Sequence, residues 1–106
     1  MIPCTCIVQD GQISAESEAT LRSKLDAISP KAFGSSAEIN WVTVPAAGGF
    51  TASKPSTSSI VSIRPSAPID QETRATLLHE LCGFWTAETG QTLNEIVGVI
   101  SAPMPA

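Results

Sequence analysis

The chain has 106 residues, a formal net charge of −4 and an apolar content of 42%. This length fits one domain, and the six Lys and Arg residues argue against nucleic acid, whose binding needs a concentrated basic surface. No apolar run approaches the roughly 20 residues of a membrane span, and the N-terminus lacks a signal-peptide pattern. We therefore expect a cytoplasmic protein without nucleic-acid or membrane partners. An odd set of three cysteines fits reduced thiols better than disulfides.

The first half of the chain reads as strand, helix and strand. Residues 4–9 form a β-prone run, and Ser14 is a suitable N-cap for the helix that follows. The apolar residues that recur there with helical spacing are Leu21, Leu25 and Ile28. We expect Pro30 and Gly34 to end this helix and residues 38–44 to form the second strand.

The second half repeats this order with bulkier side chains. Residues 59–64 predict a strand, Asp70 an N-cap, Gly90 a C-cap and residues 95–101 a last strand. The equivalent apolar stripe consists of Leu77, Leu81 and Phe84.

The two halves are similar enough to indicate a duplication. Residues 16–25 return as residues 72–81, and five of the ten positions are identical. The offset of 56 also pairs Ile7 with Ile63. An offset of 57 pairs residues of the second strands, Ile39 with Ile96 and Val42 with Val99. A repeat of this kind restricts the possible folds severely.

Two strand–helix–strand units predict a single α+β domain over residues 1–106, with the element order β-α-β-β-α-β. The pseudo-repeats are residues 1–45 and 58–103, and each crossover helix joins two parallel strands. The result is a four-stranded mixed sheet with both helices on one face. Some apolar strand residues must then point to the uncovered face, so we expect a homo-oligomer. These strand residues include Ile39, Trp41, Ile60, Ile96 and Val97.

The connecting segment, residues 46–57, is rich in Gly, Ser, Thr and Ala. Such a length is unusual for a simple connection in a compact domain. It is either a surface linker or a loop that lies over a ligand site or a neighbouring subunit.

Familiar metal, phosphate and nucleophile patterns fail. Residues 49–54 approach a phosphate loop, but Pro55 stands where Ser or Thr would hold magnesium. His79 is the only histidine, which excludes a two-histidine zinc motif and makes a serine triad improbable. Cys4 and Cys6 fit ordinary strand packing better than metal binding. We expect no metal and no cofactor.

Two features remain as candidates for chemistry. Arg64 ends the first strand of the second half, where its planar guanidinium can bind a carboxylate, although a merely exposed arginine is an equal alternative. The N-terminus, Met1-Ile2-Pro3, leads directly into a strand. An α-amine, with a pKa near 8, can act as a base near neutral pH.

Three segments carry a resemblance to a known family: residues 10–14, residues 40–46 and residues 58–61. With the repeat and the length, they make the whole chain resemble the tautomerase superfamily. The two-unit subgroup that includes the cis-3-chloroacrylic acid dehalogenases is the most similar. The resemblance implies a tautomerase/MIF-like fold, assembly as a homotrimer, and a small carboxylate substrate. Such proteins act on small keto or enol acids or 3-substituted acrylic acids by tautomerisation, hydration or decarboxylation.

The resemblance also implies a general base or acid at an N-terminal proline, with arginines that bind the substrate carboxylate. Alignment on Gly11 and Ser14 places Ile2 at the position of that proline, and Pro3 follows one residue late. The nitrogen of Pro3 is in an amide bond and cannot act as a base.

The catalytic residues that follow are Met1, Pro3 and Arg64, and the substrate-binding residues are Arg64, Lys54 and Trp41. In one hypothesis the protein is a weak or altered isomerase or lyase, in which the amine of Met1, or of a trimmed Pro3, moves a proton. In a second it is a non-catalytic homologue, a small-acid binding protein or a structural oligomer. A third is an unrelated ferredoxin-like ligand-binding domain with the same element order.

Overall fold

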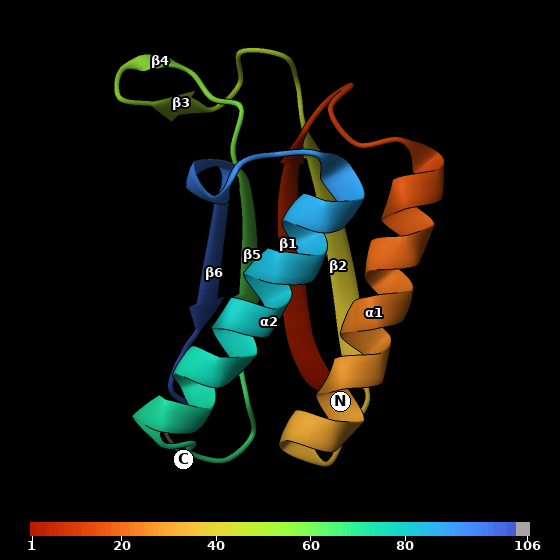
Figure 1. Ribbon diagram of the computed structural model, residues 1–106, viewed down its shortest axis with the longest axis vertical. Helices are drawn as coiled ribbons and strands as arrows, with labels where there is room; N and C mark the ends of the chain where they lie inside the picture. Colours follow the sequence, from red (N-terminus) through yellow and green to blue (C-terminus); the bar gives the residue numbers. More distant parts are fainter. Residues whose placement is uncertain (104–106) are drawn as a thin grey trace.

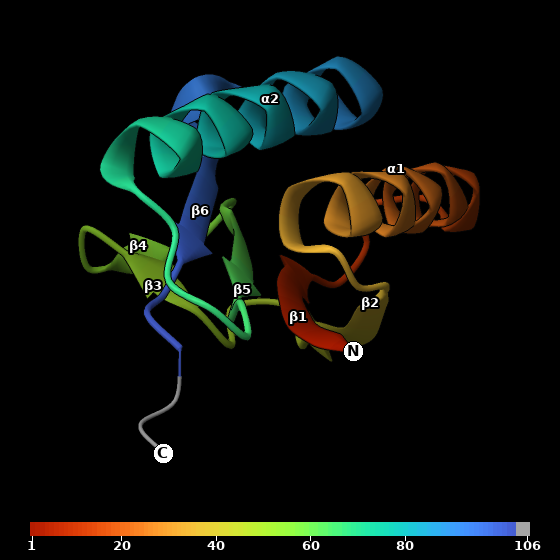
Figure 2. The ribbon, with the colours of Figure 1, turned by 90° about the horizontal axis from the view of Figure 1, so that it is seen from below.

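The computed structural model describes residues 1–103 and has two layers, with both helices covering one face of a sheet (Figures 1 and 2). Its elements in chain order are β1 (Ile2–Gln9), α1 (Ala15–Phe33), β2 (Ala37–Val44), β3 (Phe50–Thr51), β4 (Lys54–Pro55), β5 (Ser59–Ile63), α2 (Gln71–Thr89), a 3₁₀ turn (Leu93–Glu95) and β6 (Ile96–Ile100). In this described part, no helix combines the length and apolar character needed to cross a membrane.

The main sheet has the predicted four strands in mixed orientation. Its order is β2-β1-β5-β6, with β1 parallel to β2, β5 parallel to β6, and β1 antiparallel to β5 at the centre. Each half therefore contributes one parallel pair joined through its helix, as a βαβ unit requires. The predicted order β-α-β-β-α-β is confirmed for the main sheet and its two helices.

The two helices begin and end 56 residues apart, as the repeat predicts. Ser14 and Asp70 are the N-caps, and their side chains accept hydrogen bonds from the backbone N–H of Ser17 (3.1 Å) and Thr73 (2.8 Å). Gly34 and Gly90 end the helices with φ of 72° and 77°, a left-handed conformation that glycine adopts without strain.

Pro30 does not end α1, which is a correction to the sequence prediction. The helix continues to Phe33, and Pro30 accepts a hydrogen bond from the backbone N–H of Gly34 (3.0 Å). A proline inside a helix leaves the carbonyl four residues earlier, here that of Asp26, without its helical donor. Both residues are exposed, so water can supply this bond.

The strands obey the repeat less strictly than the helices. Even-numbered residues of β1 are buried under the helices, whereas in β5 the odd-numbered residues are. The pairing of Ile7 with Ile63 is therefore wrong, because a shift of one residue moves a strand side chain to the other face. The offset of 57 does preserve the faces of the second strands: Ile39 and Ile96 pack on the helix side, and Val42 and Val99 point away from it.

The sheet face that carries no helix keeps an apolar surface. Of the apolar strand residues expected there, Ile60 and Val97 are on it, whereas Ile39, Trp41 and Ile96 pack on the helix side. The large apolar side chains exposed on the uncovered face are Val42 (38%), Ile60 (38%), Val97 (47%) and Val99 (39%).

The connecting segment is not a plain linker, because it contains the β3–β4 hairpin at the end of the sheet where β1 finishes (Figure 1). Its two-residue turn places Ala52 and Ser53 at φ of 52° and 63°. The sequence lacks the Asn-Gly or Gly-Gly that normally marks such turns, so it gave no hairpin signal. The loop also packs on β1: Gln9 is 8% exposed and donates from Nε2 to the carbonyl of Ser58 at 3.4 Å.

Candidate functional site

Pro3 and Arg64 lie side by side at the end of the sheet where β1 begins and β5 ends. Because these strands are antiparallel, with Cys4 opposite Ile63, the next residue of each is brought together. The backbone N–H of Arg64 donates to the carbonyl of Pro3 at 3.0 Å, and both residues are exposed. Two of the predicted catalytic residues, 61 positions apart in the chain, are thus neighbours.

Ile2 fixes the N-terminal segment beside Arg64. Its side chain is 1% exposed, and its backbone N–H donates to the carbonyl of Ser36 at 2.8 Å. Burial of an isoleucine side chain contributes about 1.5–3 kcal/mol, so a cut that left Pro3 as the first residue would remove a core side chain. Met1 is 72% exposed and has no such role in packing.

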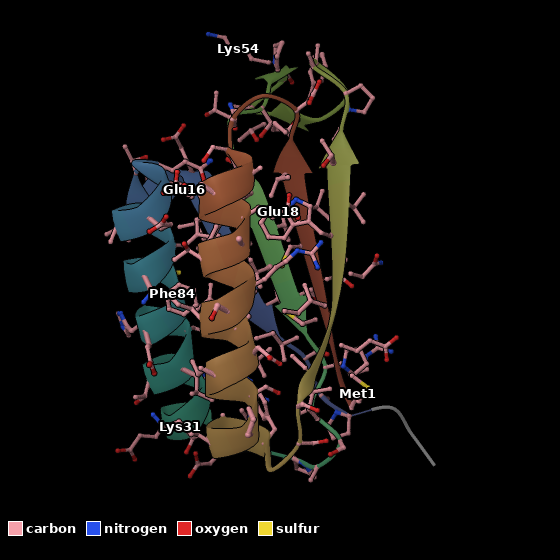
Figure 3. All side chains as sticks on the ribbon, turned by 90° about the vertical axis from the view of Figure 1, so that its right-hand side faces the viewer. Met1, Glu16, Glu18, Lys31, Lys54 and Phe84 are labelled. Carbon is pink, nitrogen blue, oxygen red and sulfur yellow. The ribbon has the colours of Figure 1, made fainter. Side chains whose placement is uncertain are left out.

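Lys54 lies away from this end of the sheet. It belongs to β4 in the hairpin, and Figure 3 shows Lys54 and Met1 at opposite ends of the molecule. A single chain therefore does not bring Lys54 together with Arg64.

Trp41 lies between the layers. Its ring stacks on that of Trp85 with a centroid distance of 5.9 Å, and the Arg22 guanidinium carbon lies 5.5 Å from the Trp41 centroid. Arg22 is also paired with Glu18 at 2.9 Å. Trp41 pairs with Cys6 in the sheet, three residues and about 10 Å along β1 from Pro3, and on the opposite face. The structure gives Trp41 a packing role.

The cysteines are poor nucleophiles in this environment. Cys4 and Cys6 are buried; their mutual hydrogen bond lowers the pKa of Cys4 and, together with burial, raises that of Cys6. Burial also raises the pKa of the Cys82 thiol. A reactive cysteine needs an accessible thiolate, which neither environment favours. Over residues 1–103, no three His, Cys, Asp or Glu side chains are grouped so that they could hold a metal ion.

One surface feature escaped the sequence prediction. A groove of about 530 Å³ lies between α1 and α2, with Lys24, Lys31 and Glu80 among its lining residues. The recurrence of lysine seven residues apart, two helical turns on one face, was its only signal in the sequence.

No protein-family model and no curated protein matches the chain, but solved structures match nearly all of it. Native Ps01740 is 21% identical, with a TM-score of 0.88 over 98% of this chain and 95% of that one. N1, a member of the cis-3-chloroacrylic acid dehalogenase family, is 11% identical, with a TM-score of 0.85 over 98% and 79%. A fused 4-OT solved as a symmetric trimer is 17% identical, with a TM-score of 0.83 over 97% and 85%.

At these identities the likeness is one of fold. It extends through both βαβ units, and the matched structures have chains of similar length. The chain has the tautomerase/MIF-like fold, as the sequence predicts.

Proposed function

We propose that this protein is a member of the tautomerase superfamily that transfers a proton on a small keto or enol acid, or on a 3-substituted acrylic acid. It works in the cytoplasm, as a homotrimer and without a cofactor. The observation that carries the proposal is the position of Arg64 directly beside the N-terminal segment on this fold. A carboxylate-binding cation and an amine are the two groups that such a reaction needs.

Arg64 binds the substrate carboxylate in this proposal. Its guanidinium presents donors in a planar fork, which matches the two oxygens of a carboxylate better than a lysine ammonium does. The exposed position of Arg64 leaves it open to a ligand from solvent. N1, which shares the fold, belongs to a family named for a small unsaturated acid, and this supports the substrate class.

The α-amine of Met1 is the proposed proton carrier. The nitrogens of Ile2 and Pro3 are both in amide bonds, and that of Ile2 donates to Ser36. In ketonisation of an enol, the protonated amine donates to the carbon, the enol hydroxyl releases its proton to water as the carbonyl forms, and water reprotonates the amine. An amine placed by a flexible exposed residue is poorly oriented, so we expect weak activity.

Assembly through the uncovered sheet face completes the proposal. Exposed Val42, Ile60, Val97 and Val99 form an apolar surface there, and the fused 4-OT with this fold is a symmetric trimer. Because Lys54 lies at the opposite end of its own chain, its predicted role in substrate binding requires a neighbouring copy. We propose no substrate contact for Trp41.

The test combines intact-mass measurement with assays on phenylenolpyruvate and 3-haloacrylates. We expect an intact Met1 and slow turnover, and a loss of kcat/KM on the order of tenfold to a hundredfold in Arg64→Ala, because a hydrogen-bonded charged partner is removed. Arg64→Lys should retain part of the activity, since it keeps the charge and loses the fork. Asp26→Ala, an exposed charge on α1, is the matched control.

An intact Met1 with no turnover of either substrate class would overturn the enzyme proposal. The amide state of the Ile2 and Pro3 nitrogens favours a second candidate, a non-catalytic homologue that retains a small-acid site. That candidate predicts binding of cis-3-chloroacrylate without turnover, and loss of this binding in Arg64→Ala.

A further inference from the structure

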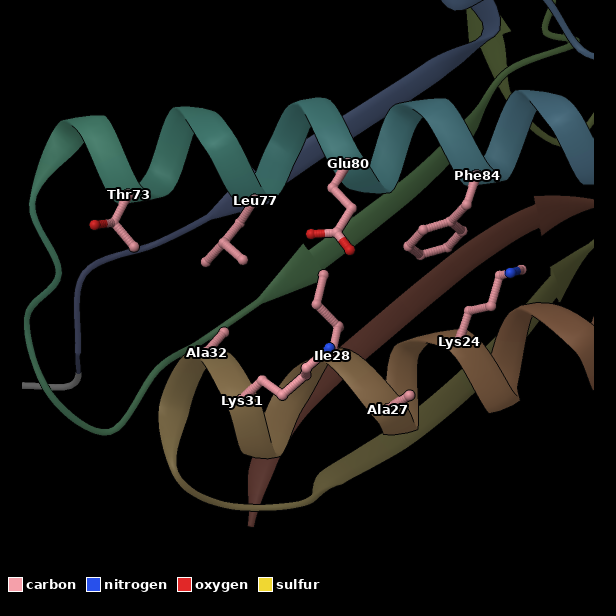
Figure 4. A pocket seen from close by; sticks show the side chains of 9 residues that line it. All are labelled: Lys24, Ala27, Ile28, Lys31, Ala32, Thr73, Leu77, Glu80 and Phe84. Carbon is pink, nitrogen blue, oxygen red and sulfur yellow. The ribbon is translucent and has the colours of Figure 1, made fainter.

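The groove between α1 and α2 has the size of a small-ligand site. Its volume of about 530 Å³ falls within the roughly 300–1,000 Å³ typical of such sites. All of its lining residues come from the two helices, and Figure 4 shows them along both walls. They are Lys24, Ala27, Ile28, Lys31, Ala32, Thr73, Leu77, Glu80 and Phe84.

The base of the groove is apolar and already formed. Ile28, Leu77 and Phe84 are half-buried, and Leu77 and Phe84 pack against the hydrophobic core. Ala27 and Ala32 line the α1 wall with small side chains, which leaves the space between the helices open. An apolar ligand chain placed here would leave water without a large rearrangement of the protein.

The rim of the groove is charged. Lys24 and Lys31 are seven residues apart on α1, or about 10 Å along its axis, and Glu80 faces them from α2 (Figure 4). Within residues 1–103, the one ion pair is that between Arg22 and Glu18, so none of these three groups has an ion-pair partner there. Two ammonium groups and one carboxylate leave a net positive rim on a chain with a net charge of −4.

The duplication explains this polarity. Lys24 and Glu80 are 56 residues apart, as are Ile28 and Phe84, so the groove lies between equivalent faces of the two helices. The apolar pair is preserved between the copies, whereas the charged pair is of opposite sign. The α1 wall is therefore the cationic one.

We propose that this groove binds a small amphipathic carboxylate, with its apolar chain on Ile28, Leu77 and Phe84 and its carboxylate at Lys24 or Lys31. Glu80 pairs with the lysine that the ligand leaves unused. A docked peptide helix fits less well, because a stable protein interface takes roughly 20–30 residues a side and the groove offers nine.

This site is separate from the proposed tautomerase site. The groove opens in the helix layer, and the helices cover only one face of the sheet (Figure 2). It contains none of Met1, Pro3 and Arg64, and it stays accessible in an oligomer built through the uncovered sheet face. Failure of either proposal therefore leaves the other intact.

The experiment is a calorimetric titration of the full chain with decanoate, with decanol and decylamine as neutral and cationic probes of the same length. We expect decanoate to bind most tightly. Lys24→Gln and Lys31→Gln should each weaken it up to about fivefold, and Glu80→Gln should tighten it by a similar factor. Lys54→Gln removes the same charge from the hairpin and should bind decanoate as the unaltered chain does.

The proposal is overturned if decanoate does not bind, if decanol binds equally well with no effect of the lysine variants, or if decylamine binds more tightly than decanoate. Binding of an acidic helical peptide without binding of decanoate would also overturn it, in favour of a protein partner. Phe84→Ala should weaken both decanoate and decanol, and thermal unfolding of this variant would show whether the fold is retained.

Discussion

The two βαβ copies share a helix frame but fill the space beneath it differently. At equivalent positions, 56 residues apart, α1 has Ser29 and α2 has Trp85, and both are buried. Ser29 donates to the carbonyl of Ser35 at 2.7 Å, whereas the indole of Trp85 donates to Gln91 at 2.9 Å. The ring of Trp85 also stacks on Trp41 of the first copy. The second copy thus supplies bulk to the core of both.

The same exchange occurs between helix and strand. Arg22 lies over Trp41 in the first copy. In the second copy, Leu78 occupies the equivalent helix position, and Gly98 follows Trp41 at an offset of 57. A Cβ on Gly98 would lie 3.0 Å from a methyl of Leu78, so the leucine fills the space that a strand side chain would take. A duplicated frame therefore permits different core packing in each half.

The largest expected effect is on the residue that bridges the copies. Trp85→Ala should lower the free energy of unfolding by about 3–5 kcal/mol, because it creates a large cavity and removes the stack on Trp41. Ser29→Ala, at the equivalent position, removes one hydrogen bond and should cost about 1 kcal/mol. Urea unfolding of both variants measures the difference. Equal losses would show that the two copies contribute equally to the core.

The starts of the two first strands give the next contrast. Ile2 begins β1 with a buried apolar side chain, whereas Ser59 begins β5 with a buried hydroxyl that donates to Gln91 at 3.1 Å. Ile2→Ala should cost about 2–4 kcal/mol and Ser59→Ala about 1 kcal/mol. Urea unfolding again provides the measurement. A small loss in Ile2→Ala would mean that β1 does not depend on its N-terminal anchor, and a trimmed Pro3 would then be a serious candidate for the base.

Much of this frame could be predicted from the sequence because its signals are local. Ser14, Asp70, Gly34 and Gly90 act at the helix ends through contacts with residues a few positions away, and all four were predicted correctly. The sheet order follows from the chirality of βαβ units and the repeat. The prediction that Pro30 ends α1 failed because a proline near an exposed last turn costs little when water can replace the lost bond.

The site depended on information that the sequence does not hold locally. The proximity of Arg64 to Pro3 comes from the antiparallel register of β1 and β5, and the distance of Lys54 from both comes from the hairpin. The core role of Ile2 was missed because one apolar residue before a strand has no periodicity of its own. The groove likewise joins helices whose facing residues are about 56 positions apart.

The helix caps test where the two copies should be alike. Gly34→Ala and Gly90→Ala each place a Cβ on a residue with φ above 70°, where an L side chain is strained. Nothing lies within 4 Å of either new Cβ, so backbone strain is the main cost, and each variant should lose about 1 kcal/mol of unfolding free energy. Thermal unfolding of the pair would show this, and a clear inequality would contradict the equivalence of the two helix frames.

The N-caps provide the smallest difference, and pH should reveal it. Hydrogen bonds from the side chain and the backbone N–H of Thr73 hold the pKa of Asp70 below its ordinary value, whereas Ser14 does not titrate. Because the folded pKa is the lower one, this stabilisation is fully present above the unfolded value, near 4, and is lost as the pH falls through the folded value. Asp70→Asn keeps a capping side chain without the charge. The melting temperature of the unaltered chain should therefore exceed that of the variant at pH 7, and the gap should close between about pH 4 and pH 2. A gap that stays constant over this range would mean that the cap of the second copy, like that of the first, acts without its charge.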